Sequence, residues 1–145
     1  SGAYIPLTED EAIKRCARLI ALFERHKVRV IRCGLHPSEG LVSGREHCAG
    51  PFHTAFRQKV ETYIYYTLFK HLSKEKKSSK KIQTVYCNSK EAGSVIGYAR
   101  SNAIYAQRAF GKGCGFKASR SVKQGTIRLR FNNGKYMTLK KLGAI

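Results

Sequence analysis

The sequence predicts an α+β fold, with a helical core followed by a helix-turn-helix and a basic β-hairpin in a winged-helix-like arrangement. Two long stretches before residue 73 repeat apolar residues at helical spacing. Two short helical patterns separated by a glycine follow residue 87, and two alternating stretches then flank an Asn-Asn-Gly turn. With 145 residues and 42% hydrophobic content, the chain is long enough to bury a core.

We expect one nucleic-acid-binding domain that spans residues 1–145. Within it, residues 1–72 form the helical core half and residues 82–145 form the basic, winged-helix-like half. A basic linker rich in lysine and serine joins them over residues 73–81. Such a run is typical of a solvated connection, and the alternatives are an arm that contacts phosphates or a nuclear import signal.

The first helix is predicted to begin after Thr8 and to run to about His26. Glu11 stands three residues after Thr8, where its side chain completes a capping box. A short strand rich in β-branched residues is expected over Val28–Arg32. The glycines and prolines of Gly34–Pro51 then predict an irregular loop.

A second long helix is predicted from Phe52 to about Leu72. Its middle is apolar nearly all round, because Tyr65, Tyr66 and Phe69 widen the apolar stripe. A helix of this kind is buried in a core or lies in an interface. We expect it to be the central core helix, and a homodimer contact stays open as the alternative.

The charge of the chain is strongly positive and unevenly distributed. Lys and Arg number 28 against nine acids, a formal net charge of +19. Residues 51–145 hold twenty basic and three acidic residues, a net of +17, whereas residues 1–50 hold eight and six, a net of +2. Charge concentrated in one part of a chain is typical of polyanion binding. No apolar run approaches the ~18 residues of a membrane span. An anionic membrane surface could also attract this charge, but no segment requires an amphipathic helix with exposed apolar anchors, so nucleic acid is favoured as partner.

The basic half is predicted to begin with a strand over Ile82–Tyr86 and to continue with a helix capped by Asn88 or Ser89. Gly97 supplies the turn, and a second helix runs over Ser101–Phe110 and presents its N-terminal part to the major groove of duplex DNA. Two packed helices without such a role are the alternative. The side chains expected to contact nucleic acid, on this helix and beyond it, are Arg100, Ser101, Asn102, Tyr105, Arg108, Lys112, Lys117, Arg120, Lys123, Arg128, Arg130 and Lys135.

The hairpin prediction specifies a register. A three-residue loop, Asn132–Gly134, with the glycine in the left-handed conformation, pairs Leu129 with Met137 on one face. The same register places Arg128 and Arg130 on the other face, so one face is apolar and the other basic. The glycine-rich stretch that precedes the hairpin is expected to be a flexible loop.

Two cysteines and two histidines form the best candidate for a metal site: Cys33, His36, Cys48 and His53, with His47 as a substitute ligand. Their pattern, Cys-x2-His-x11-Cys-x4-His, has the ligand types and count of a tetrahedral zinc site. The five cysteines of the chain are an odd, scattered set, which favours reduced thiols or metal ligands over disulfides. Ordinary core or loop residues are the alternative.

The sequence offers only poor combinations of side chains that could act together in catalysis, so an enzymatic function is disfavoured. The single aspartate, Asp10, lies in a predicted helix cap. We therefore predict a DNA-binding regulator or a replication or recombination factor inside the cell, in the nucleus or nucleoid. The first alternative is an RNA-binding protein of viral or ribonucleoprotein type, in which exposed aromatic rings stack on bases. The second is a metal-dependent nuclease built on the histidine cluster with Glu46.

Overall fold

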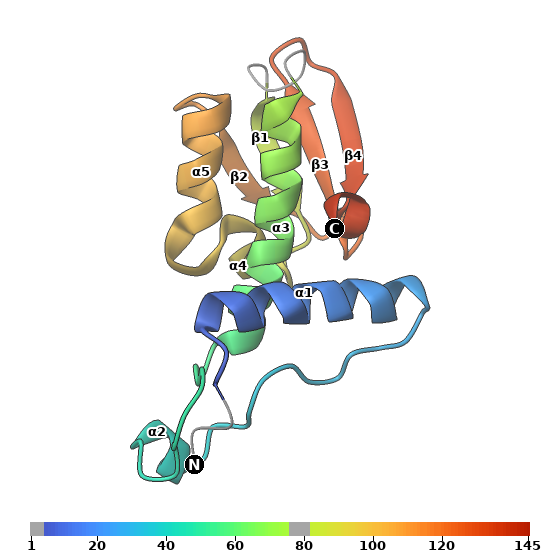
Figure 1. Cartoon of the computed structure of the whole chain (residues 1–145). Coiled ribbons are helices and arrows are strands. Elements are labelled where there is room, and N and C mark those ends of the chain that lie inside the picture. The colour runs from blue at the N-terminus through green and yellow to red at the C-terminus, as the bar shows by residue number, and fades with distance from the viewer. Residues whose placement is uncertain (1–4, 76–81) are drawn as a thin grey trace. The chain divides into compact units, whose positions relative to one another are not determined.

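The computed structural model describes residues 5–75 and 82–145 and has a mixed α+β architecture with one four-stranded sheet (Figure 1). This confirms the predicted α+β class but not the winged-helix-like arrangement. The chain divides into two compact units, residues 1–60 and residues 61–145. Most of the predicted basic linker, residues 76–81, lies outside the described residues. None of the described helices is long and apolar enough to cross a membrane.

Helix α1 (Glu9–Arg25) begins as the sequence predicts. The Thr8 hydroxyl accepts a hydrogen bond from the Glu11 amide at 3.3 Å, and the Glu11 carboxylate accepts one from the Thr8 amide at 2.9 Å. The bond from the Thr8 amide, together with one that the Thr8 hydroxyl donates to the same carboxylate, lowers the pKa of the Glu11 carboxyl. Ile20 on this helix is buried, whereas Leu22 and Phe23 are exposed. The apolar surface of α1 is therefore only partly used within its unit.

The predicted strand over Val28–Arg32 does not form. These residues belong to no sheet in the described part of the chain, and the Arg57 guanidinium donates a hydrogen bond to the Val30 carbonyl at 2.9 Å. A side chain thus satisfies a backbone group that a strand would have paired. The irregular loop that follows contains a one-turn helix, α2 (Glu39–Val42), capped by the Ser38 hydroxyl.

Helix α3 (Phe56–Lys74) begins in the first unit and continues in the second. It starts four residues later than predicted. In the second unit its Tyr65, Phe69 and Leu72 are buried in one apolar cluster with the sheet. The prediction of a central core helix is confirmed for this part, and the homodimer contact stays a prediction.

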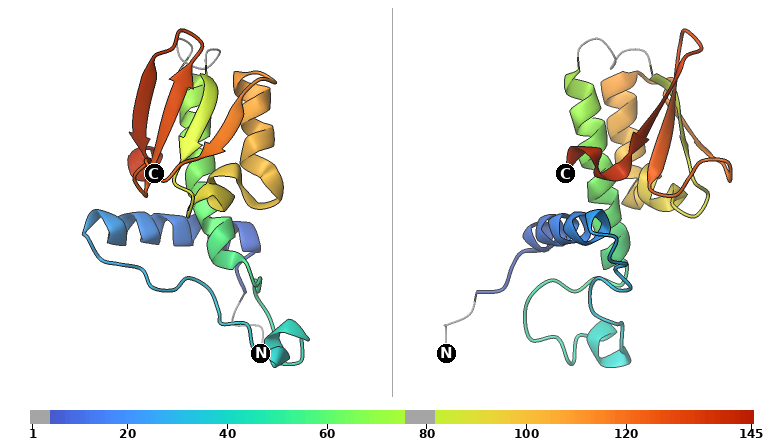
Figure 2. Two further views of the ribbon diagram at one scale, coloured as in Figure 1. Left: turned by 180° about the vertical axis from the view of Figure 1, so that it is seen from behind. Right: turned by 90° about the vertical axis from the view of Figure 1, so that its right-hand side faces the viewer.

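The sheet belongs entirely to the second unit, in the strand order β2-β1-β3-β4. Its strands are β1 (Ile82–Cys87), β2 (Gly115–Ala118), β3 (Thr126–Phe131) and β4 (Tyr136–Lys140). Helices α3 and α5 (Ser101–Phe110) lie on one face, and none of the described helices of this unit covers the other face (Figure 2). Strand β2 was expected to be a flexible glycine-rich loop, and it pairs in parallel with β1.

The hairpin of β3 and β4 has the predicted register. Leu129 pairs with Met137, Arg128 with Thr138 and Arg130 with Tyr136. Leu129 joins the apolar cluster under the helices, so Arg128 and Arg130 lie on the helix-free face. After β4, a short 3₁₀ turn (Lys141–Ala144) places the Lys141 ammonium 3.2 Å from the Glu61 carboxylate.

Candidate anion-binding site

A four-residue turn, Gly97–Arg100, connects helix α4 (Ala92–Ile96) to α5. Its backbone has positive φ at Gly97 (92°), Ala99 (50°) and Arg100 (61°). A Cβ on Gly97 would lie 2.6 Å from the Ser101 hydroxyl oxygen, so this position requires glycine. The Tyr98 amide donates to the Thr62 hydroxyl of α3 at 3.0 Å, while the side chains of Tyr98 and Arg100 are exposed. The turn therefore holds a strained backbone and presents an aromatic ring and a cation to solvent.

Asn102 does not lie on an exposed recognition face. It is 1% exposed, and its amide nitrogen donates to the Thr62 carbonyl at 3.0 Å and to the Ser94 carbonyl at 3.3 Å. Tyr105 is half-buried, with its hydroxyl 2.9 Å from the Ser73 hydroxyl. These two side chains tie α5 to α3, and Asn102 has no access to base edges. The prediction that Asn102 reads the major groove is wrong.

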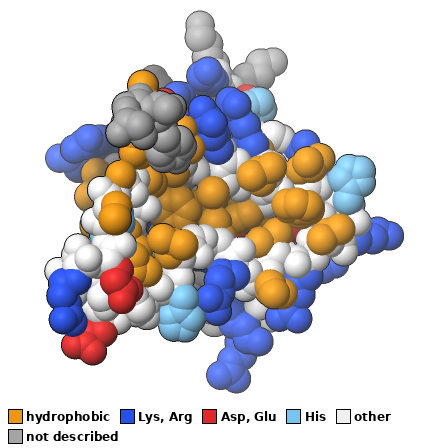
Figure 3. Space-filling view, turned by 60° about the horizontal axis from the view of Figure 1, so that its bottom comes forward, with side chains coloured by type: hydrophobic (Ala, Val, Ile, Leu, Met, Phe, Trp, Pro, Cys, Tyr) orange, Lys and Arg blue, Asp and Glu red, His pale blue; other side chains and the backbone are white. Residues whose placement is uncertain are grey.

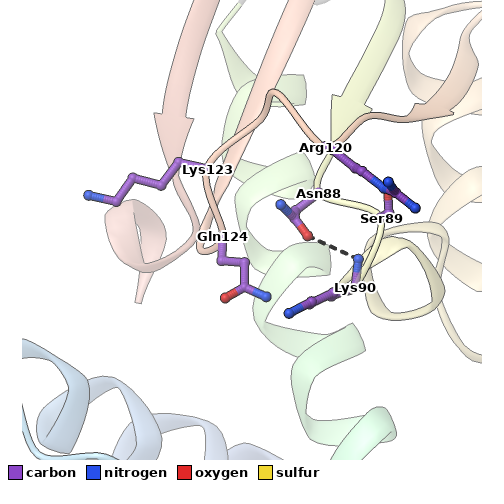
Figure 4. A pocket seen from close by; sticks show the side chains of 6 residues that line it. All are labelled: Asn88, Ser89, Lys90, Arg120, Lys123 and Gln124. Atoms are coloured by element: carbon purple, nitrogen blue, oxygen red, sulfur yellow. Dashed lines mark hydrogen bonds between the residues drawn. The ribbon is translucent and has the colours of Figure 1, made fainter.

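A pocket of about 690 Å³ lies where β1 and β2 end (Figure 4). It is lined by the segment after β1 and the loop before β3, namely Asn88, Ser89, Lys90, Arg120, Lys123 and Gln124. The three basic side chains make no ion pair within residues 5–75 and 82–145. The lining thus offers three cations and several hydrogen-bond donors, and none of the described residues that line it carries a carboxylate.

The helix-free face of the sheet combines cations with aromatic rings. The Arg128 guanidinium lies 5.7 Å from the centre of the Tyr86 ring and 5.6 Å from that of Tyr136. The Nε atoms of Arg128 and Arg130 are buried and have no hydrogen-bond partner among the described residues. Lys117 is exposed on β2 beside Tyr86 in the register. Such a surface is suited to phosphates and unpaired bases.

The remaining predicted contact residues are distributed around the same unit. Ser101 and Arg108 are exposed on α5, Lys112 is exposed in the loop after it, and Lys135 lies in the turn between β3 and β4. Their contact with nucleic acid stays a prediction.

Sequence reasoning missed Asn88, Ser89, Lys90 and Gln124 as parts of a site. The signal that could have found them is their position: ligands of parallel sheets bind beyond the carboxyl ends of the strands. Their position could not be deduced from the sequence, because the glycine-rich stretch that forms β2 was not predicted to pair with β1.

The predicted zinc ligands do not form a site. No group of three His, Cys, Asp or Glu side chains able to hold a metal is found in the part of the chain that the structure describes. The His36 Nδ1 atom lies 3.0 Å from the Pro37 carbonyl, and the His53 Nδ1 atom accepts a hydrogen bond from the Ala55 amide at 2.9 Å. Local backbone groups therefore occupy these ring atoms, and Cys33 and Cys48 do not complete a set of ligands.

Comparison with known proteins gives one finding. The family model described as the Radical_SAM C-terminal domain matches residues 1–66. No match was found among curated proteins or among solved structures.

Membership of the radical SAM family would imply an iron–sulfur cluster and S-adenosylmethionine as cofactors. Such clusters are held by several cysteine thiolates, and the described residues bring no three candidate ligands together. Burial raises the pKa of the Cys87 and Cys114 thiols to about 11, which keeps both neutral at pH 7. The described residues do not fit the cluster, and no chemical step is assigned to it.

The match overturns the prediction of a DNA-binding regulator or a replication or recombination factor. The helix-turn-helix interpretation and the nuclear or nucleoid placement depended on that function and fall with it. The match indicates neither an RNA-binding protein of viral or ribonucleoprotein type nor a histidine-centred nuclease. The family comparison instead associates residues 1–66 with radical SAM proteins.

Proposed function

We propose that the chain belongs to a radical SAM-associated protein in which residues 1–66 adjoin the catalytic region and residues 61–145 hold a single-stranded RNA. The first part rests on the family match. Its exposed apolar side chains, such as Leu22 and Phe23 on α1, suit an interface with another domain. Figure 3 shows hydrophobic side chains gathered in a band on one side of the molecule and bordered by lysines and arginines.

The observation that carries the RNA proposal is the uncompensated charge of the second unit. Residues 61–145 hold eighteen basic and three acidic residues, a net of +15. Glu61 pairs with Lys141, and the Glu91 carboxylate accepts a hydrogen bond from the Gly125 amide at 2.7 Å. The third acid, Glu75, is exposed at the end of α3. The cations of the pocket and the turn are therefore left to attract phosphates.

A single strand is favoured over a duplex because two side chains in the first turn of α5 are buried. Asn102 and Ala103 face the interior, so these two side chains cannot reach base edges in a major groove. The exposed rings of Tyr98 and Tyr136 are instead suited to stacking on unpaired bases. We take RNA as the class of strand because recognition of RNA mostly targets unpaired loops and ends.

The test measures binding of a fluorescent twelve-nucleotide single-stranded RNA at two salt concentrations, with single-stranded DNA and duplex DNA as competitors. Affinity should fall with salt, with a slope of about −0.7 per phosphate contact. Arg100→Gln should weaken binding by about tenfold or more, since a hydrogen bond to a charged group contributes ~1.5–3 kcal/mol. Arg15→Gln, which removes one exposed charge from α1, is the matched control. Equal effects of the two substitutions, or a preference for duplex DNA, would overturn the proposal.

A further inference from the structure

The pocket at the end of the parallel strands has the position of a ligand site. Cys87, the last residue of β1, pairs with Ala118, the last residue of β2. Asn88 follows directly after β1, and Arg120 lies two residues after β2. Ligands of sheets with parallel strands commonly bind just beyond this edge. The topology thus brings two basic segments, more than 25 residues apart in sequence, to the same place.

The walls of the pocket are fixed by hydrogen bonds. The Asn88 side chain donates to the Val122 carbonyl at 2.7 Å. It also accepts a hydrogen bond from the Lys90 amide at 3.0 Å, which Figure 4 shows. The Ser119 amide donates to the Cys87 carbonyl at 2.8 Å. The segment after β1 and the loop before β3 therefore hold each other in place. A site fixed before binding loses less entropy when a ligand arrives.

The chemistry of the lining selects an anion. Lys90, Arg120 and Lys123 contribute positive charge, and the Ser89 hydroxyl and the Gln124 amide add hydrogen-bond donors. The nearest acid in sequence is Glu91, whose carboxylate is bound by the Gly125 amide. Three cations without a carboxylate suit a phosphate group, and most of all a dianionic terminal phosphate.

The pocket is larger than a phosphate requires. A volume of about 690 Å³ falls in the range of ~300–1,000 Å³ that is usual for small-molecule sites. We propose that this pocket binds a terminal nucleotide through its phosphomonoester group, with Lys90 and Arg120 on the phosphate oxygens. The inference rests on the proposed function where the nucleotide is the end of an RNA strand.

The pocket and the Gly97–Arg100 turn lie at opposite ends of α4. This helix has five residues and is therefore ~8 Å long. A strand that contacts Arg100 can thus place its terminal nucleotide near Lys90. The phosphate can come from a strand end or from a free nucleotide, and the two sources are separated by the probes below.

The experiment titrates the full chain with four probes: an eight-nucleotide RNA with a 5′-phosphate, the same RNA with a 3′-phosphate, the same RNA with neither, and AMP. One terminal phosphate should improve RNA affinity about tenfold. Arg120→Gln and Lys90→Gln should each remove that gain, so that each variant binds the phosphorylated and the unphosphorylated RNA with affinities within about twofold of each other. Lys135→Gln, at the hairpin turn, should keep the gain. All three side chains are exposed, and thermal melts will verify that each variant folds.

The outcomes separate the two proposals. If RNA binds equally well with and without a terminal phosphate, the pocket proposal is wrong and the RNA proposal stands. If no RNA binds, the proposed function is wrong, and the AMP titration decides the pocket alone. Shifts of the Ser89 and Lys90 backbone amide resonances on AMP addition, lost in Arg120→Gln, would then support a free-nucleotide site. If no RNA binds and these amide resonances do not shift on AMP addition, the pocket proposal is wrong as well.

Discussion

The two units of the chain differ in what they bury and in what they expose. Residues 1–60 carry ten basic and six acidic residues, a net of +4, and expose large apolar side chains. Residues 61–145 carry a net of +15 and bury one apolar cluster that includes Phe69, Val85 and Leu129. The first unit has helix and irregular segments, whereas the second has a complete sheet covered by helices on one face.

This difference separates two kinds of surface. The free energy falls when another protein domain covers an exposed apolar surface and removes it from water. A basic surface attracts polyanions from a distance. The family match lies mainly on the first unit, while the cations and the pocket lie on the second. The chain thus combines a region suited to protein contact with a region suited to a charged ligand, and the three predictions below test this division.

The largest effect is expected at the turn of the second unit. Gly97→Ala should lower the free energy of unfolding by about 3–5 kcal/mol, because it adds backbone strain at a φ of 92° to overpacking. The new Cβ would lie 2.6 Å from the Ser101 hydroxyl oxygen and 2.7 Å from the Asn102 nitrogen. Gly134→Ala is the control, with a φ of 79° and no atom near the new Cβ, and should cost about 1–2 kcal/mol. Urea unfolding of both variants measures the difference, and equal losses would show that the turn is not tightly packed.

A smaller effect is expected at the Lys141–Glu61 pair, whose side chains are 9% and 13% exposed. Lys141→Ala should destabilise the second unit by about 3 kcal/mol, because it leaves the Glu61 carboxylate in a poorly solvated position. Lys140→Ala removes the same charge from an exposed neighbour and should change stability by less than about 0.5 kcal/mol. Thermal unfolding distinguishes the two variants. If both variants lose little stability, the Lys141–Glu61 pair does not anchor the C-terminal turn to α3.

What the sequence predicts well is local. The capping box of Thr8 and Glu11 spans three residues, and the register of β3 and β4 follows from the turn at Asn132–Gly134. Both depend on side chains and backbone angles that neighbours in sequence determine. They are therefore recognisable without knowledge of the rest of the fold.

What the sequence fails to predict depends on distant partners. Asn102 is a residue type that often contacts bases, but its side-chain amide donates a hydrogen bond to the Thr62 carbonyl, 40 positions away. The glycine-rich β2 becomes a strand because β1 lies beside it. Conversely, the β-branched residues of Val28–Arg32 favour a strand, yet no partner strand lies beside them in the described residues. Tertiary contacts outweigh local preference in each case.

The smallest effect is expected on the exposed face of α1. Leu22 is 50% exposed, so Leu22→Ser should change the free energy of unfolding by no more than about 0.5 kcal/mol. Ile20 is 2% exposed, so the milder Ile20→Val should cost more, about 1 kcal/mol, through the loss of a buried methyl group. Urea unfolding of the two variants compares neighbouring side chains on one helix. A loss at Leu22 as large as that at Ile20 would mean that this face is already covered within the chain. A neutral Leu22→Ser would leave the face free to contact the catalytic domain of a radical SAM protein.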